Sequence, residues 1–387
     1  MAVAGSGALA IGMITATAAP ASAATIACGT TITTNVTLSA NIDCTADTTD
    51  NALIIGAAGI TVDLNGYSIL GPGYSAGTVG IADDPADTQS VGYSNLTVED
   101  GTISNFGTDV DAEGTDNTSP PPACSAYLDG VSVVNVTATS TELEGDGFYG
   151  DCLSGSYIHR LSASDDEYGV YLSNSESSIV SYNHVQRPEF GLYDYEGKSN
   201  KWFGNAISGV EDHGIDLEGT TTDTANANTI SGRGADGIYE EETGGVYPTG
   251  DTFDNNVLND LYDGVYQDGA SGDTVHHNKG SKDGWGLYAD ETTDNTYTDN
   301  QFDSNQYGIE TDYPTGEVLN GNVASHNSDA GIDIYTNFDT TGGYSASLGG
   351  NTANYNRFGL YSQIPTAGSG NHASHNKVVN CHNVTCS

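Results

Sequence analysis

Tyrosine recurs at a fixed place in a short phrase that the chain repeats, and this recurrence is the first sign of a binding surface. The phrase is a glycine, an aliphatic or aromatic residue, and then usually a tyrosine or an acid. The tyrosines in this position are Tyr149, Tyr171, Tyr193, Tyr239, Tyr266, Tyr288 and Tyr361. An apolar ring with a polar hydroxyl suits contact with sugars, so we expect these residues to bind carbohydrate. The alternative is a structural ladder of stacked aromatics.

Acids recur two positions beyond the tyrosine position in five consecutive copies of the phrase. They are Glu218, Glu241, Asp268, Asp290 and Asp312. If the copies stack, neighbouring carboxylates lie about 4.8 Å apart and each pair repels by about 1 kcal/mol in water. Calcium prefers such oxygen ligands, so we predict a calcium site along this stripe. The residue between the tyrosine position and the acid position of each copy should face inward. In three copies this residue is nevertheless polar, namely Asp194, Glu240 and Gln267.

Positive charge is concentrated in one part of the chain. Five of the nine Lys and Arg residues fall between residues 160 and 233, and His159, His184 and His213 lie in the same part of the chain. A cation, a base and carboxylates in one groove are what proton abstraction beside a uronate carboxylate requires. The residues that would form such a catalytic groove are Arg187, Lys201, His213 and Asp212. The alternative is an ion pair between Asp165 and Arg187, one coil apart, with the other cations scattered.

The six cysteines indicate an exported protein. They group as Cys28 with Cys44, Cys124 with Cys152, and Cys381 with Cys386. Six cysteines allow 15 pairings, and nearest-neighbour pairing is the most economical. The first and last pairs would then hold the two ends of the chain, where a repeat protein needs caps.

These residues are positioned by a repeat. The glycines of the phrase, from Gly147 to Gly359, follow one another at steps of 22, 22, 23, 23, 27, 22, 22, 23 and 28 residues. A second phrase, centred on an asparagine, keeps the same period from Asn183 to Asn351. Few leucines and no helical periodicity argue against leucine-rich repeats. A parallel β-helix fits the β-favouring residues after each glycine, and its stacked coils would let each asparagine amide bond the next.

The phrase pair formed by Tyr168-Gly-Val-Tyr-Leu-Ser-Asn174 and Ser181-Tyr-Asn-His184 resembles the repeats of the pectin-lyase-like superfamily. The resemblance covers about residues 50 to 380. It implies an all-β fold, a right-handed parallel β-helix with coils of about 22 residues. That superfamily contains lyases, hydrolases, epimerases, adhesins and metal-delivery accessories, so the resemblance leaves the function open.

Composition and the two ends restrict the partners and the compartment. Nine Lys and Arg against 52 Asp and Glu make a net charge of -43, which disfavours nucleic acid and anionic membranes. The acidity suits either high salt or divalent cations. Residues 1–24 read as a secretory signal peptide that ends at Ala21-Ser22-Ala23, although no Lys or Arg precedes Arg160. Residues 25–387 read as one β-helix domain with a protruding loop at 108–128, and no later stretch is apolar enough to span a membrane.

Three functions remain from the sequence. The first is a secreted or cell-surface protein that engages extracellular polysaccharide through the Tyr and acid files. The second is a polysaccharide lyase or epimerase that acts on a uronate polymer, with its site around Arg187, Lys201 and His213. The third is a structural or adhesive rod. The sequence decides neither catalysis nor oligomeric state.

Overall fold

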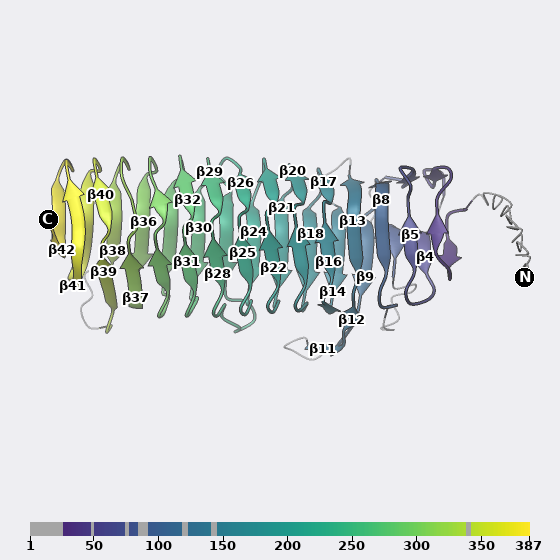
Figure 1. The fold of residues 1–387 in the computed structure, drawn as a ribbon, viewed down its shortest axis with the longest axis horizontal. Coiled ribbons are helices and arrows are strands. Elements are labelled where there is room, and N and C mark those ends of the chain that lie inside the picture. Colours follow the sequence, from purple (N-terminus) through teal and green to yellow (C-terminus); the bar gives the residue numbers. More distant parts are fainter. Residues whose placement is uncertain are drawn as a thin grey trace, which may run out of the picture.

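The computed structural model describes residues 26–47, 50–73, 77–83, 92–117, 123–140, 145–337 and 342–387. The predicted signal peptide lies outside these residues. The described chain is wound into one long stack of coils that runs from the purple to the yellow end of Figure 1. None of the described residues forms a helix long and apolar enough to cross a membrane.

Each regular coil contributes three short strands, one to each side of the stack. One coil, for example, contains β24 (His213–Glu218), β25 (Thr224–Asn226) and β26 (Thr229–Ser231). The three sides are called the first, second and third sheet, in that order along each coil.

The first sheet consists of β1 (Thr30–Ile32), β4 (Asn51–Ile55), β7 (Val79–Ala82), β9 (Thr108–Glu113), β14 (Asp146–Asp151), β18 (Tyr168–Ser173), β21 (Phe190–Tyr195), β24, β27 (Asp236–Glu241), β30 (Asp263–Asp268), β33 (Trp285–Asp290), β36 (Tyr307–Asp312), β38 (Ala330–Tyr335), β41 (Phe358–Ser374) and β42 (Val379–Cys386). The second sheet consists of β2 (Val36–Thr37), β5 (Thr61–Asp63), β8 (Thr97–Ser104), β13 (Ser132–Thr139), β16 (Tyr157–His159), β19 (Ile179–Ser181), β22 (Lys201–Phe203), β25, β28 (Thr252–Asp254), β31 (Thr274–His276), β34 (Thr296–Thr298), β37 (Thr315–Asn320) and β39 (Ser345–Gly349). The third sheet consists of β3 (Ile42–Asp43), β6 (Ser68–Leu70), β17 (Ser162–Ser164), β20 (His184–Gln186), β23 (Ala206–Ser208), β26, β29 (Val257–Asn259), β32 (Lys279–Ser281), β35 (Gln301–Phe302) and β40 (Thr352–Asn354). The long strands β8 and β13 continue from the second side onto the third, and β41 also continues past the first.

The predicted stacking of coils is confirmed. Strand β18 pairs in parallel with β21, one coil further on, so that Tyr171 lies beside Tyr193. The glycine that opens each phrase is needed because the coils approach closely there. A Cβ on Gly169 would lie 2.6 Å from the carbonyl oxygen of Gly191 and 2.6 Å from a methyl carbon of Val185. Any larger residue would therefore push the coils apart.

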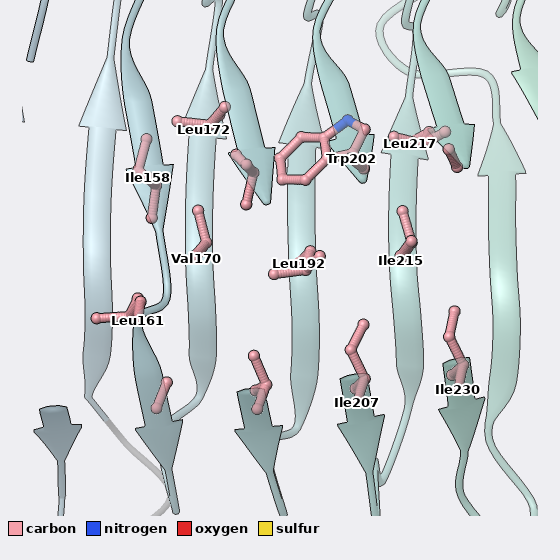
Figure 2. Close-up of a cluster of buried hydrophobic side chains, with 14 of the residues drawn as sticks. Ile158, Leu161, Val170, Leu172, Leu192, Trp202, Ile207, Ile215, Leu217 and Ile230 are labelled. Carbon is pink, nitrogen blue, oxygen red and sulfur yellow. The ribbon is translucent and has the colours of Figure 1, made fainter. Parts of the chain in front are cut away.

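The aliphatic residue after each glycine points into the core, as the alternation of a strand predicts. Val170, Leu192 and Ile215 are fully buried, and they stand in a file through successive coils (Figure 2). Trp202 of the second sheet and Ile207 of the third complete the same cross-section. These residues form an apolar column that the three sheets enclose.

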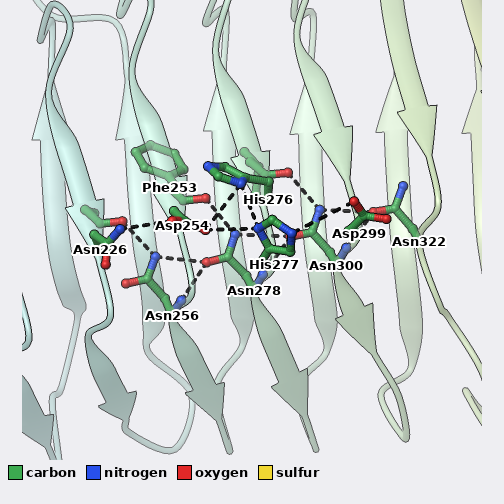
Figure 3. A network of polar contacts seen from close by, with 12 residues as sticks. Asn226, Phe253, Asp254, Asn256, His276, His277, Asn278, Asp299, Asn300 and Asn322 are labelled. Atoms are coloured by element: carbon green, nitrogen blue, oxygen red, sulfur yellow. Dashed lines mark hydrogen bonds and ion pairs between the residues drawn. The ribbon is translucent and has the colours of Figure 1, made fainter.

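The predicted asparagine ladder is also present. The buried Asn256 side chain donates to Oδ1 of Asn278 at 2.9 Å, and Asn278 donates in turn to Oδ1 of Asn300 at 3.1 Å. The same Oδ1 atoms accept the backbone N–H of the preceding asparagine. Figure 3 shows this ladder crossing the coils between the second and third sheets. Each amide thus satisfies backbone and side-chain groups that would otherwise be buried without partners.

The loop predicted at 108–128 is only partly a loop. Its first six residues form β9, which pairs with β7 and β14 as part of the stack. The protrusion is the antiparallel pair β10 (Thr115–Asn117) and β11 (Ala123–Ala126), followed by β12 (Leu128–Asp129), which returns to pair with β15 (Leu153–Ser154). The disulfide between Cys124 and Cys152 ties this hairpin to the stack. The other disulfides join Cys28 to Cys44 and Cys381 to Cys386, as predicted from their spacing.

The interior also holds carboxylic acids, at the turn between the first and second sheets. Asp251 and Asp273 continue a file in which each Oδ1 accepts the backbone N–H of the residue one coil earlier. Glu240 points inward from β27, and its ligand atom lies within 4.8 Å of those of Asp251 and Asp273. Burial, followed by the charges of Asp273 and Asp251, raises the pKa of Glu240 well above its usual range. The inward polar position seen in the sequence therefore contributes Glu240 to a buried acid cluster in which burial raises the pKa of each carboxyl group.

Candidate functional site

The predicted tyrosine file exists on the outer face of the first sheet. Tyr149 pairs with Tyr171 and Tyr171 with Tyr193 in adjacent strands. Further along, Tyr239, Tyr266 and Tyr288 are paired in the same way. The side chains are half-buried to buried, since each lies against its neighbours above and below. The spacing of the glycine phrase therefore identifies a real surface feature.

The rings of this file are stacked on each other, which changes what they can bind. The ring centres of Tyr149 and Tyr171 are 5.0 Å apart with planes 15° from parallel, and those of Tyr239 and Tyr266 are 4.9 Å apart with planes 7° from parallel. Each ring therefore covers the faces of its neighbours, leaving edges and hydroxyl groups outward. The expectation that sugars stack on these ring faces is corrected for the closely stacked part of the file.

The tyrosine hydroxyls are paired with the acid stripe beside them. Tyr239 donates to Oε2 of Glu241, and Tyr288 donates to Oδ2 of Asp312 at 3.2 Å. Burial, then Asp312 and Asp290, raises the pKa of Tyr288, so its hydroxyl stays protonated. Burial and nearby acids raise the pKa of Asp312 to about 7. This face therefore offers neutral hydroxyl donors and carboxyl acceptors in alternating files.

The acid stripe is aligned as predicted within two runs of paired strands. Glu218 lies beside Glu241, and Asp268, Asp290 and Asp312 follow one another in adjacent strands. In the part of the chain that the structure describes, none of these acids forms an ion pair with Lys, Arg or His. No three of them bring ligand atoms close enough to share one ion, within the same limits. The geometry thus gives no support to the calcium site predicted along the stripe.

The tyrosine file is interrupted at two places, and the first gap is filled. Asp216 occupies the file position between Tyr193 and Tyr239. The His213 ring stacks on Tyr239, with centres 3.8 Å apart, and its Nδ1 lies 2.7 Å from Oδ2 of Asp216. Burial raises the pKa of Asp216 to about 7, although the hydrogen bond to His213 opposes this. Burial lowers the pKa of His213, but Asp216 and other acids outweigh it, so the net shift is upward.

The second gap is open. Glu310 and Asp333 replace tyrosine between Tyr288 and Tyr361. Glu310 accepts a hydrogen bond from Nε1 of Trp285 at 2.6 Å, and a pocket of about 220 Å³ lies beside Asp333. The pocket is lined by Tyr307, Asp329, Asp333, Arg357, Phe358 and Tyr361. Because the file lacks aromatic rings at Glu310 and Asp333, no tyrosine fills the space beside Tyr361. This is the hollow in the aromatic face that the sequence did not reveal.

The pocket carries charges that nearly cancel. Arg357 Nη1 lies 3.4 Å from Oδ1 of Asp329, and its guanidinium lies 4.8 Å over the ring of Phe358. Tyr307 donates to Oδ2 of Asp329 at 3.3 Å. Burial, then the charges of Glu310, Asp312 and Asp329, raises the pKa of Asp333 to about 8. At neutral pH the pocket thus holds one ion pair, one protonated carboxyl and aromatic surface.

The predicted catalytic groove is not assembled. Asp212 and His213 are in contact, with Oδ1 and Nε2 3.4 Å apart. Arg187 instead makes a bidentate pair with Asp165, one coil earlier, which is the alternative expected from the repeat. Lys201 projects from β22 of the second sheet, on another side of the stack, and lines a different pocket. The repeat period gives the position of each residue along a coil. It does not show that residues on different sheets, such as Lys201 and His213, are too far apart to share a groove.

Comparisons with known proteins support the fold. The sequence profile "Right handed beta helix region" matches residues 194–353, and that of "Periplasmic copper-binding protein (NosD)" matches residues 110–247. A search of curated proteins found no match. The A-module of the mannuronan C-5 epimerase AlgE4 of Azotobacter vinelandii is similar in structure, with a TM-score of 0.56 and 13% identity, over 84% of this chain and 91% of that one.

The A-module of a second mannuronan C-5 epimerase of that organism, AlgE6, gives a TM-score of 0.50 at 16% identity, over 92% of this chain and 91% of that one. Identities this low establish the fold alone. The chain therefore folds as a right-handed parallel β-helix.

Proposed function

We propose that this protein is exported and binds a polysaccharide along the outer face of the first sheet, with the pocket beside Tyr361 as the site of tightest contact. The observation that carries the proposal is the break in the tyrosine file at Glu310 and Asp333, which opens a hollow at the end of an otherwise closed aromatic surface. A binding face that is long, shallow and hollowed at one place suits a polymer more than a small molecule.

The chemistry of the pocket suits a sugar unit. The rings of Phe358 and Tyr361 are tilted by 59° with centres 5.6 Å apart, so they do not cover each other. The ring of His382, in the paired strand β42, stacks on Tyr361 with centres 4.8 Å apart. Sugars combine apolar C–H faces with hydroxyl groups that both donate and accept. Asp333 can donate through its proton, Asp329 can accept, and Arg357 can donate. The pocket therefore supplies partners for both parts of a sugar.

Charge selects among polymers. The chain carries a net charge of -43, and the acid stripe runs beside the tyrosine file along the same face. A polyanion such as a uronate polymer would be repelled at low ionic strength. Within the pocket, the charge of Arg357 is balanced by Asp329. An uncharged polysaccharide is therefore the preferred ligand.

Export is supported by the three disulfides, because such bonds persist in oxidising compartments outside the cytosol. The predicted signal peptide at residues 1–24 agrees with this. Mass spectrometry of the mature protein tests it: the expected N-terminus follows Ala23 or Ala24, and an uncleaved chain recovered only from the cytosol would overturn export.

Binding is tested by affinity electrophoresis of the full chain through gels that contain neutral glucans, mannans, pectate or alginate. We expect retardation by a neutral polymer, and a loss of about tenfold in affinity for Tyr361→Ala, since ring contact is worth on the order of 1.4 kcal/mol. Tyr355→Ala is the matched control, because Tyr355 is an exposed tyrosine that does not line the pocket. If Tyr361→Ala and Tyr355→Ala were retarded equally, or if no polymer retarded the protein, the proposed binding face would be wrong.

The same experiment distinguishes the catalytic alternative. A uronate lyase generates an unsaturated sugar whose absorbance is measured directly. An epimerase inverts a carbon atom of the sugar unit and produces no unsaturated sugar. Absorbance that appears with pectate or alginate, and disappears in His213→Gln, would favour a lyase at the Asp212–His213 pair over simple binding. Retardation without new products supports the proposal.

A further inference from the structure

A cluster of one aspartate and two histidines lies on the outer side of the second sheet, away from the tyrosine file. Asp254 ends strand β28 and His276 ends strand β31, and the two are directly paired in adjacent coils. His277 follows at the corner of the turn with φ of 55°. Figure 3 shows the three side chains converging in front of the asparagine ladder. The left-handed backbone at His277 therefore places its side chain beside His276, the last residue of β31.

The three ligand atoms form a tight triangle. Nδ1 of His276 lies 3.2 Å from Oδ1 of Asp254, Nδ1 of His277 lies 3.3 Å from the same oxygen, and the two nitrogens are 2.9 Å apart. Ligands held about 2.0–2.2 Å from one transition-metal ion lie about 2.9–3.5 Å from each other, from octahedral to tetrahedral geometry. The observed edges fall in this range.

The surroundings prepare these atoms for a cation. Asn226 donates to Oδ2 of Asp254 at 3.0 Å, which orients the carboxylate and leaves Oδ1 toward the histidines. Nε2 of His277 lies 3.9 Å from Oδ2 of Asp299. Such outer partners orient metal ligands in known sites. Among the described residues, no Lys or Arg forms an ion pair with Asp254.

Protonation alone satisfies the triangle poorly. If both Nδ1 atoms carried protons, two N–H groups would face each other across 2.9 Å and share one carboxylate oxygen. If neither did, three acceptors would converge on a point without a donor. If one did, its N–H would be directed at either the other Nδ1 or Oδ1 of Asp254, and one of the three contacts would still lack a donor. A single cation between them satisfies all three.

We propose that Asp254, His276 and His277 bind a first-row transition-metal ion, Zn²⁺ or Cu²⁺. Two imidazoles and one carboxylate match the preference of these ions, whereas Ca²⁺ and Mg²⁺ favour sites made of oxygen alone. The side chain of His276 is 26% exposed and that of His277 51% exposed, so the ion is reached from solvent and completes its coordination with water. The site is independent of the polysaccharide face, because it lies on another sheet.

The test is calorimetric titration of the full chain with ZnCl₂, in millimolar CaCl₂ to occupy exposed carboxylates. The variant is His276→Thr with His277→Asn. Threonine is the residue that pairs with His276 on the next coil, and asparagine already occupies the left-handed corner one coil earlier at Asn255. Both replacements thus suit the local backbone. His375→Asn is the matched control, because His375 is also an exposed corner histidine, with φ of 59°.

We expect one Zn²⁺ per chain, an affinity at least about tenfold weaker in the double variant, and no change in His375→Asn. With Cu²⁺, electron paramagnetic resonance should show hyperfine coupling to two nitrogens in the wild type and lose it in the double variant. Unfolding midpoints without metal confirm that all chains fold. Equal Zn²⁺ affinity in wild type and double variant, or a Cu²⁺ spectrum without nitrogen coupling, would overturn the proposal.

Discussion

Raising the pH from 6 to 8 should destabilise this protein, because its interior stores carboxylic acids in their protonated form. Asp263, Asp273, Asp283 and Glu317 are buried, and burial is the first cause that raises the pKa of each to about 8. The ordinary pKa of such groups is about 4. The folded chain therefore binds more protons than the unfolded chain throughout the interval between these values.

The sign and the size follow from proton linkage. A carboxyl group with a raised folded-state pKa contributes its full stability below about pH 4, and that contribution is lost as the pH rises through about 8. For one group with a pKa of about 8, the loss between pH 6 and pH 8 is about 2 kcal/mol. Several such groups act in the same direction, and repulsion within a chain of net charge -43 adds to them.

The assay is urea unfolding at pH 6, 7 and 8, at constant ionic strength and with a chelator. Asp273→Asn tests the cause, since Asn295 occupies the same file one coil further on and accepts the same kind of backbone N–H. This variant should lose up to about 2 kcal/mol of the pH dependence. Asp129→Asn, at an exposed carboxylate, is the control. A free energy of unfolding that is constant or rises from pH 6 to 8 would refute the reasoning.

Three further predictions concern the scaffold. Asn278→Ala should cost about 3 kcal/mol or more in urea unfolding, because it leaves buried donors and acceptors on both neighbouring coils without partners; a cost below about 1 kcal/mol would mean that the ladder is replaceable. Arg187→Ala should change stability by less than about 1 kcal/mol, since its pair with Asp165 is exposed, and a larger loss would show that this pair is structural. Replacing Cys28 and Cys44 together by alanine should lower the free energy of unfolding by roughly 3 kcal/mol, and an unchanged value would show that the first coils do not need this cap.

An acid replaces tyrosine at both gaps in the tyrosine file, but one gap is filled by a neighbouring ring and the other is left open as a pocket. At Asp216, the ring of His213 moves into the position that a tyrosine would fill and stacks on Tyr239. At Asp333, the preceding file position holds Glu310, and the space is left as a pocket. Both gaps are visible in the sequence as acids in place of tyrosine. Only the neighbouring side chains decide whether such a gap is closed.

The sequence by itself determined how the chain is wound and which residues share a file. A strict period with glycine at close approaches and asparagine at turns leaves few other ways to satisfy a buried backbone, so the coils, the asparagine ladder and the aligned tyrosines followed from spacing. Tertiary structure alone decided that the tyrosine rings hide each other's faces, that Lys201 stands apart from His213, and that Glu240 joins an acid cluster inside the stack. The physical reason is that periodicity describes position along one strand file, whereas ring orientation, burial and proton binding depend on neighbours in adjacent coils and across the core.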